Sequence, residues 1–132
     1  MPTQQQIANV SDAELVERMV TSHPDRFDPA FWDDFSRHFQ PALSSSATLI
    51  DIGCGPGLFL RDLRQRFPSA RLLGTDVTPA MIEYAKQQDY SGTNPEYHLH
   101  DIVTQPLPLA DHSADFVSMV AVLHVLDNPF PV

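Results

Sequence analysis

Cysteine and positive charge are both scarce in this sequence. Its 132 residues include one cysteine, Cys54, so no internal disulfide can form, and we expect a reducing, cytoplasmic location. Eight lysines and arginines stand against seventeen aspartates and glutamates, giving a formal net charge of −9 at pH 7. Nucleic-acid-binding proteins usually gather basic residues on one face, so we expect no nucleic-acid partner.

Long apolar runs are also absent. No stretch of 18 apolar residues occurs, and residues 1–6 lack the charged and apolar regions of a signal peptide. We therefore expect neither a membrane partner nor secretion. The length allows one domain at most, and a hydrophobic content of 42% is enough for a buried core.

Residues 1–45 predict an N-terminal helical segment, which we expect to act as a cap or lid. Ser11 and Glu14 have the spacing of a capping box, and a second helix is expected to begin at Asp28-Pro29. Three aromatic residues repeat every four positions along that second helix: Phe31, Phe35 and Phe39. Such a stripe usually packs into a core, although Phe31 and Trp32 could also line a lid.

From residue 46 onward, strand patterns alternate with helix patterns. We expect strands at 48–52, at 71–74 running into residues 75–76, at 96–100 and at 116–122. Helices are expected at about 58–67 and from Thr78-Pro79 onward. This alternation predicts right-handed crossovers and a mainly parallel sheet, which places the protein in the α/β class.

A glycine-rich turn, Asp51-Ile52-Gly53-Cys54-Gly55-Pro56-Gly57, lies between the first predicted strand and the first helix after it. Glycines at alternating positions allow positive φ and let the backbone approach a ligand closely. The following helix would direct unpaired N–H groups at that ligand. Dinucleotide-binding enzymes require a third glycine where this chain has Leu58, so that class of site is excluded.

The spacing instead resembles the first motif of class I S-adenosylmethionine-dependent methyltransferases, D/E-x-G-x-G-x-G. Asp51 through Gly57 fill every fixed position of this motif. Three further segments match the family: Asp76 after the second strand, Asp101 after the third, and a proline-containing lead, 107–117, into the fourth. The run 121–129 is similar to L-H-H-L-D-D-P, with Val125 replacing the second histidine. The resemblance covers about residues 47–129.

This resemblance implies S-adenosylmethionine as the cofactor and S-adenosylhomocysteine as its product. In the family, an acidic residue at the position of Asp76 accepts hydrogen bonds from both ribose hydroxyls. An acidic residue at the position of Asp101 accepts a hydrogen bond from the adenine amino group. Val77 and Ile102 would form the two faces of an adenine slot. The complete set of expected cofactor-binding residues is Asp51, Gly53, Cys54, Gly55, Gly57, Asp76, Val77, Asp101 and Ile102. Cys54 is expected as a small residue fitted into the turn.

The resemblance also implies a small-molecule methyl acceptor. His124 is the titratable candidate for contact with that acceptor; otherwise it is structural or caps a helix. Residues 127–130 only partly match the D/N-P-P-Y/F box of amino-group methyltransferases, and a helix start explains them better. His98 and His100 lack a third ligand, so we expect no metal site.

In the family the complete sheet is Rossmann-like and has seven strands in the order 3-2-1-4-5-7-6. This chain supplies about four, so we expect a partial sheet of order 3-2-1-4, with residues 46–132 as the N-terminal part of an incomplete domain. The fourth strand would then leave an apolar edge open to self-association. The alternative to an enzyme is a non-catalytic cofactor-binding module or an inactive fragment.

Overall fold

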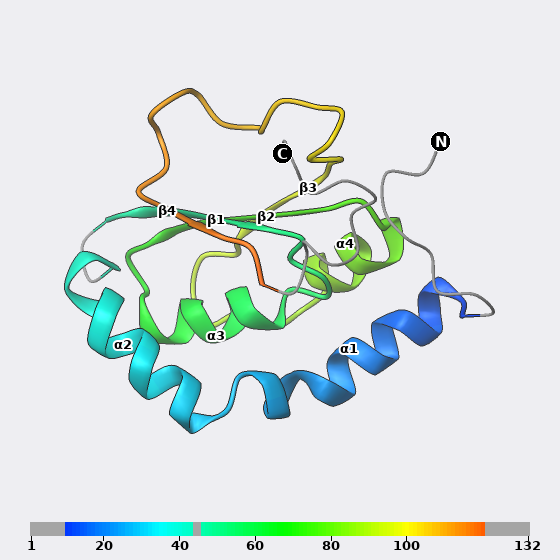
Figure 1. The fold of residues 1–132 in the computed structure, drawn as a ribbon, viewed down its shortest axis with the longest axis horizontal. Helices are drawn as coiled ribbons and strands as arrows, with labels where there is room; N and C mark the ends of the chain where they lie inside the picture. The colour runs from blue at the N-terminus through cyan, green and yellow to red at the C-terminus, as the bar shows by residue number, and fades with distance from the viewer. Residues whose placement is uncertain (1–9, 44–45, 121–132) are drawn as a thin grey trace.

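A four-stranded sheet with helices on one face forms the protein in the computed structural model, which describes residues 10–43 and 46–120 (Figure 1). The strands are β1 (Thr48–Ile52), β2 (Arg71–Asp76), β3 (Glu96–Leu99) and β4 (Phe116–Ser118). The helices are α1 (Asp12–Arg26), α2 (Pro29–Leu43), α3 (Leu58–Arg66) and α4 (Pro79–Lys86). Within the described ranges no helix is long and apolar enough to cross a bilayer.

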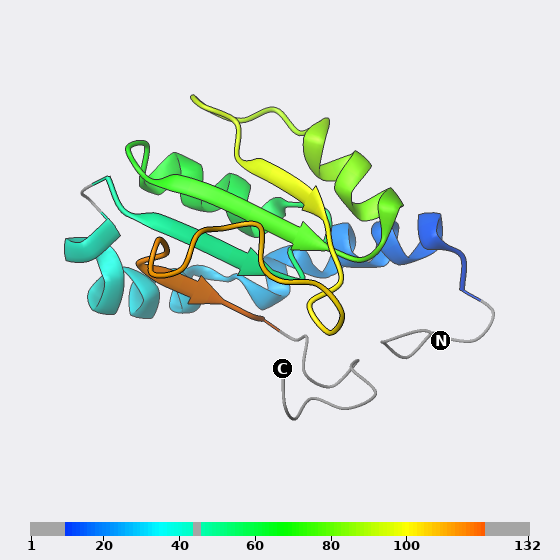
Figure 2. The same ribbon diagram turned by 90° about the horizontal axis from the view of Figure 1, so that it is seen from above.

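The strand order is β3-β2-β1-β4, and every neighbouring pair is parallel, which confirms the predicted fold class (Figure 2). Ile50 of β1 is in register with Leu73 on one side and Val117 on the other. The crossovers through α3 and α4 place both helices on the same face of the sheet (Figure 1). The connection from β3 to β4 returns across the opposite face.

Two strands end earlier than the sequence predicted. β3 ends at Leu99 instead of His100, although the backbone N–H of His100 still donates to Asp76 O; the His100 ring bonds Pro106 O at 2.7 Å. β4 was predicted to span 116–122 but ends at Ser118. Among the described strands it pairs with β1 alone, and Val117 on it is 60% exposed. Positions 121 and 122 lie outside the described residues.

The predicted starts of α1 and α2 are confirmed. Ser11 and Glu14 form a reciprocal capping box at the beginning of α1, with hydrogen bonds of 3.2 and 3.0 Å. At the beginning of α2, Asp28 Oδ1 accepts a hydrogen bond of 2.9 Å from the backbone N–H of Phe31. These contacts satisfy N–H groups that have no partner inside the helix.

An aromatic cluster fills the space between the N-terminal helices and α3. Phe59 of α3 is stacked on Phe27 at a ring-centroid distance of 5.0 Å and on Trp32 at 5.7 Å. Phe35 and Phe67 are in edge or tilted contact with the same group. The aromatic stripe of α2 is therefore core packing, and it fixes α2 against the sheet-covering helix.

The other face of the sheet is covered by the β3–β4 connection. Ile50, Ile52 and Leu73 are buried on this face. Partly buried side chains from the connection and the residue after β4 pack on them: Ile102, Leu107, Leu109, Ala114 and Met119. Leu49 and Leu72, which belong to the helix-side core, alternate with these residues along their strands.

Gly74, in the middle of β2, has no space for a side chain. A β-carbon there would lie 2.8 Å from Leu60 Cδ1, 2.8 Å from Tyr97 Cε1 and 2.9 Å from Cys54 Sγ. The absence of a side chain allows α3 to pack closely on the sheet. Gly74 therefore serves helix–sheet packing and not backbone flexibility.

We predict that Gly74→Ala lowers the free energy of unfolding by about 1–3 kcal/mol, because an added methyl forces its tightly packed neighbours apart. Chemical denaturation monitored by circular dichroism measures the change. Ser69→Ala, in the exposed turn before β2, is the control and should change stability by less than about 0.5 kcal/mol. Equal stability of the two variants would contradict the packing role of Gly74.

Candidate functional site

The turn between β1 and α3 brings three glycines to the carboxyl end of the sheet. Gly53, Gly55 and Gly57 have φ values of 72°, 56° and 82°, in the left-handed region that a β-carbon disfavours. Two backbone hydrogen bonds hold the turn: Cys54 N–H donates to Thr75 O at 2.8 Å, and Gly57 N–H donates to Cys54 O at 3.2 Å. The turn is thereby attached to β2 as well as to β1.

Gly55 and Gly57 differ in what surrounds them. A β-carbon on Gly57 would lie 2.6 Å from Tyr97 Oη and 2.8 Å from Ala85 Cβ, so protein atoms already fill that space. A β-carbon on Gly55 would meet only ordinary contact, with Met19 Cε of α1 at 3.6 Å. From the sequence we expected the backbone of the whole turn to lie close to a ligand. In the structure, Gly57 is instead packed against other residues of the protein.

Asp76, at the end of β2, is hydrogen-bonded to the glycine turn. Its Oδ2 accepts from Gly55 N–H at 3.0 Å, and its Oδ1 accepts from Thr78 N–H at 2.9 Å. Burial raises the pKa of this carboxyl group, while these backbone donors act in the opposite direction. The Thr78 side chain and the backbone N–H of Val77 also act on this carboxylate and lower its pKa.

Asp51 is a second carboxyl group at this end of the sheet, and it is only 3% exposed. Its Oδ1 accepts a hydrogen bond of 2.8 Å from Ser118 Oγ on β4. Burial, reinforced by the nearby charge of Asp76, raises the pKa of Asp51 to about 7, against the opposing effect of the Ser118 bond. The sequence did not identify Ser118, because a single hydroxyl within a strand carries no motif.

Asp101 begins the turn that follows β3. Its Oδ1 accepts from Val103 N–H at 2.9 Å, and its own N–H donates to Gln105 Oε1 at 2.9 Å. Its neighbour His100 is bonded to Asp76 through the backbone, so the ends of β2 and β3 are joined. Ile102 packs against the buried face of the sheet, and Val77 is half-buried. Their contact with adenine stays a prediction.

The structure therefore gathers Asp51, the glycine turn and Asp76, with Asp101 on the adjoining strand end. Cys54 is buried within the turn, and its Sγ donates to Gly55 O at 3.6 Å. Burial raises the pKa of this thiol well above its ordinary value, which disfavours a nucleophilic thiolate. His124 lies outside the described residues.

Two other features bear on the site. Within residues 10–43 and 46–120, no group of three histidine, cysteine, aspartate or glutamate side chains could hold a metal ion. A cavity of about 460 Å³ lies between α1 and α4, lined by residues that include Val16, Val20 and Tyr84. None of the predicted site residues lines this cavity, so its volume carries no weight in assigning the site.

We predict that Asp51→Asn removes a pH dependence of stability. Unfolded, Asp51 ionises near pH 4; folded, it keeps its proton until about pH 7, so its ionisation lowers the free energy of unfolding as pH rises between these values. The stability of the variant relative to the native chain should increase by about 2–3 kcal/mol from pH 5 to pH 8. Denaturant titrations at both pH values measure this difference.

Asp89→Asn, which removes an exposed carboxylate, is the matched control for this pH experiment. Its stability relative to the native chain should be nearly the same at pH 5 and pH 8. Parallel curves for Asp51→Asn and the native chain would show that Asp51 is ionised throughout this range.

Comparison with known proteins shows what this arrangement is similar to. A family model described as a methyltransferase domain matches residues 49–131. A malonyl-[acyl-carrier protein] O-methyltransferase of Hahella chejuensis is 36% identical over 81 residues, covering 61% of this chain and 28% of that protein. A trans-aconitate 2-methyltransferase of Enterobacter sp. is 47% identical over 45 residues, covering 34% of this chain and 18% of that protein. The chain spans about a quarter of the length of the first of these relatives.

Among solved structures, human N-acetylserotonin methyltransferase in complex with S-adenosylmethionine matches with a TM-score of 0.61 and 22% identity. That match covers 86% of this chain and 30% of the human one. The sugar N-methyltransferase KedS8 from Streptoalloteichus matches with a TM-score of 0.58 and 22% identity, covering 91% of this chain and 44% of the KedS8 chain. These likenesses show the fold. Because the family match extends over more than half of the residues, the chain belongs to the class I S-adenosylmethionine-dependent methyltransferase domain family.

Proposed function

We propose that this chain binds S-adenosylmethionine at the carboxyl ends of β1, β2 and β3, as the cofactor-binding part of an enzyme that methylates a small molecule. The observation that carries the proposal is the position of Asp76. Two backbone N–H groups hold its carboxylate at the end of β2, one of them from the glycine turn, and the residue is only partly buried. This arrangement suits the paired hydroxyls of a ribose.

The other predicted residues take their places around this carboxylate. Gly53 and Gly55 provide backbone close to the methionine part of the cofactor, while Asp51 lies behind them. Asp101 accepts the adenine amino group, and Val77 and Ile102 lie against the two faces of the ring. His124 stays the proposed contact to the acceptor. The helical segment predicted at residues 1–45 stays the proposed cap.

S-adenosylmethionine supplies a methyl group already activated by a sulfonium, so the chain need not form a covalent intermediate. The residues of the site bind and orient the cofactor, and positioning of this kind can contribute about 7–11 kcal/mol in well-oriented systems. The carboxylate of Asp76 also places negative potential where a cation would bind, and Asp51 adds to it as it ionises at about pH 7. Negative potential favours a cationic cofactor over a neutral one.

A small-molecule acceptor agrees with the charge of the chain. At −9, the protein would repel the phosphate backbone of a nucleic acid. Two of the curated relatives are named for malonyl-[acyl-carrier protein] and for trans-aconitate. A second candidate function is cofactor binding without methyl transfer.

We predict that S-adenosylhomocysteine binds the chain in a calorimetric titration and that Asp76→Asn weakens this binding by at least about tenfold. Charge-assisted hydrogen bonds from two hydroxyls contribute roughly 1.5–3 kcal/mol each, and the neutral amide loses this contribution. Asp89→Asn serves again as the matched loss of one exposed charge and should bind like the native chain. Denaturation of each variant checks that it is folded.

Absence of S-adenosylhomocysteine binding by the folded native chain would overturn the proposed function. If the chain binds, a methyl-transfer assay with trans-aconitate and other small carboxylic acids distinguishes an enzyme from a binding module. Methylated product that disappears in Asp76→Asn supports the enzyme. Tight binding without product from any acid supports the module.

A further inference from the structure

Ser118 of β4 contacts a carboxyl group of the proposed cofactor site. Its Oγ donates to Asp51 Oδ1 at 2.8 Å, although the two residues are 67 positions apart in the sequence. In the sheet, Asp51 is in register with Ser118 on one side and with Gly74 on the other. Because Gly74 has no side chain, Ser118 is the neighbour in register that can donate a side-chain hydrogen bond to Asp51.

Asp51 depends on this one donor. Within residues 10–43 and 46–120, the Ser118 hydroxyl is the only group that donates a hydrogen bond to the Asp51 side chain. None of the ion pairs between described residues includes Asp51. The residue is only 3% exposed, so water does little to replace the missing partners.

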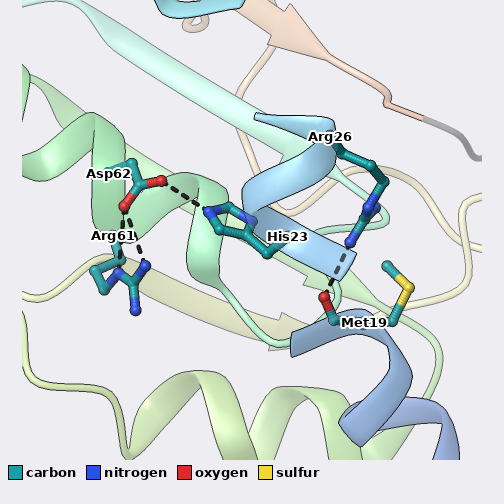
Figure 3. A network of polar contacts seen from close by, with 5 residues as sticks. All are labelled: Met19, His23, Arg26, Arg61 and Asp62. Carbon is teal, nitrogen blue, oxygen red and sulfur yellow. Dashed lines mark hydrogen bonds and ion pairs between the residues drawn. The ribbon is translucent and has the colours of Figure 1, made fainter. Parts of the chain in front are cut away.

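Another carboxyl group, Asp62 of α3, shows what Asp51 lacks. Asp62 Oδ2 is 2.7 Å from His23 Nε2, and its Oδ1 accepts from the Arg61 guanidinium at 3.3 Å (Figure 3). Burial acts to raise the pKa of Asp62, but these two partners bring it below its ordinary value. Asp51 has a single neutral hydroxyl in their place, so burial dominates and its pKa rises to about 7.

Three other titratable groups act on or are affected by Asp51. They are Asp76 at the end of β2, Cys54 in the glycine turn and Tyr97 on β3. The helix α3, which packs on the same face, contributes the apolar Leu60 beside β2. Burial raises the pKa of Cys54 and of Tyr97, so both stay neutral near pH 7. The two aspartates are therefore the groups that can carry negative charge here.

The two forms of the cofactor differ in charge at the sulfur. S-adenosylmethionine has a positively charged sulfonium, whereas S-adenosylhomocysteine has a neutral thioether, and the rest of the molecule is the same. An ionised Asp51 attracts the sulfonium more than the thioether, while a protonated Asp51 has no charge with which to distinguish them. The ratio of the two affinities therefore reports the charge of Asp51.

We propose that Ser118 is a positioning residue of the cofactor site, whose hydroxyl orients Asp51 and holds it as a carboxylate, so that the site prefers the cationic methyl donor to its neutral-sulfur product. This role rests on the proposed function, because it requires the cofactor to bind beside Asp51. The competing explanation is that Ser118 only supports the pairing of β4 with β1. The two explanations differ in whether ligand preference changes with pH.

The test measures the dissociation constants of S-adenosylmethionine and S-adenosylhomocysteine by calorimetric titration at pH 5.5, 6.5 and 7.5. The proteins are the native chain, Ser118→Ala, Ser118→Thr, Asp51→Asn and Ser113→Ala. Asp51→Asn supplies the pH dependence that comes from the ligands and from other residues. Ser113→Ala is the matched control, because it removes a serine hydroxyl that donates to Ala110 O at 2.6 Å, in the segment before β4.

For the native chain we expect the preference for S-adenosylmethionine to grow at least about threefold from pH 5.5 to pH 7.5, after correction by Asp51→Asn. Ser118→Ala should show at most about half of this growth, because without its donor Asp51 stays protonated to higher pH. Ser118→Thr keeps the hydroxyl and should restore the native growth. Ser113→Ala should match the native chain.

A measurement without ligand checks the same contact independently. Ionisation of Asp51 lowers the free energy of unfolding from about pH 4 up to the pKa of the folded state. In Ser118→Ala the pKa of Asp51 is expected to rise further, so this loss of stability relative to Asp51→Asn should extend to higher pH than in Ser118→Thr. Denaturant titrations across this range measure the difference.

Two results would overturn the proposal. Native-like growth of the preference in Ser118→Ala, even with weaker binding of both ligands, would leave Ser118 a structural role only. Growth that persists undiminished in Asp51→Asn would assign the pH dependence to another group, such as Asp76. Failure of the folded native chain to bind either ligand is a different outcome, because it overturns the proposed function itself, while the stability measurement still reports on the Ser118 contact.

Discussion

The hydrogen bond from Gly55 N–H to the Asp76 carboxylate is the contact on which the site depends. It joins the glycine turn that follows β1 to the end of β2, and the second oxygen of Asp76 accepts from Thr78 at the beginning of α4. One carboxylate therefore sets the relative positions of two strand ends and one helix. Because Asp76 is only partly buried, its carboxylate is also within reach of a ligand.

Burial of two carboxyl groups at one end of the sheet is costly unless donors or a cation offset it. The backbone amides at Asp76 and the hydroxyl of Ser118 at Asp51 offset part of this cost. The rest appears as the raised pKa of each acid. A cationic cofactor would interact favourably with the carboxylate of Asp76, and with that of Asp51 once it is ionised.

Local signals in the sequence predicted most of the strands and helix starts. Ser11 and Asp28 cap the helices they were expected to cap, because capping depends on neighbours a few residues away. The strand order 3-2-1-4 came from the family resemblance and is confirmed. The length of β4 and the packing role of Gly57 were not predictable in this way. Both depend on residues distant in the sequence: the single partner strand of β4, and Tyr97 beside Gly57.

The same distinction applies to the surroundings of the glycine turn. The strand-end residues of the proposed site lie within the family match, which begins at residue 49. Met19 of α1, which lies 3.6 Å from the position of a β-carbon on Gly55, comes before that match. No motif spacing links these two residues, because the contact exists only after α1 packs against α3 and α4. The glycine motif therefore identifies the turn but not the helix that lies beside it.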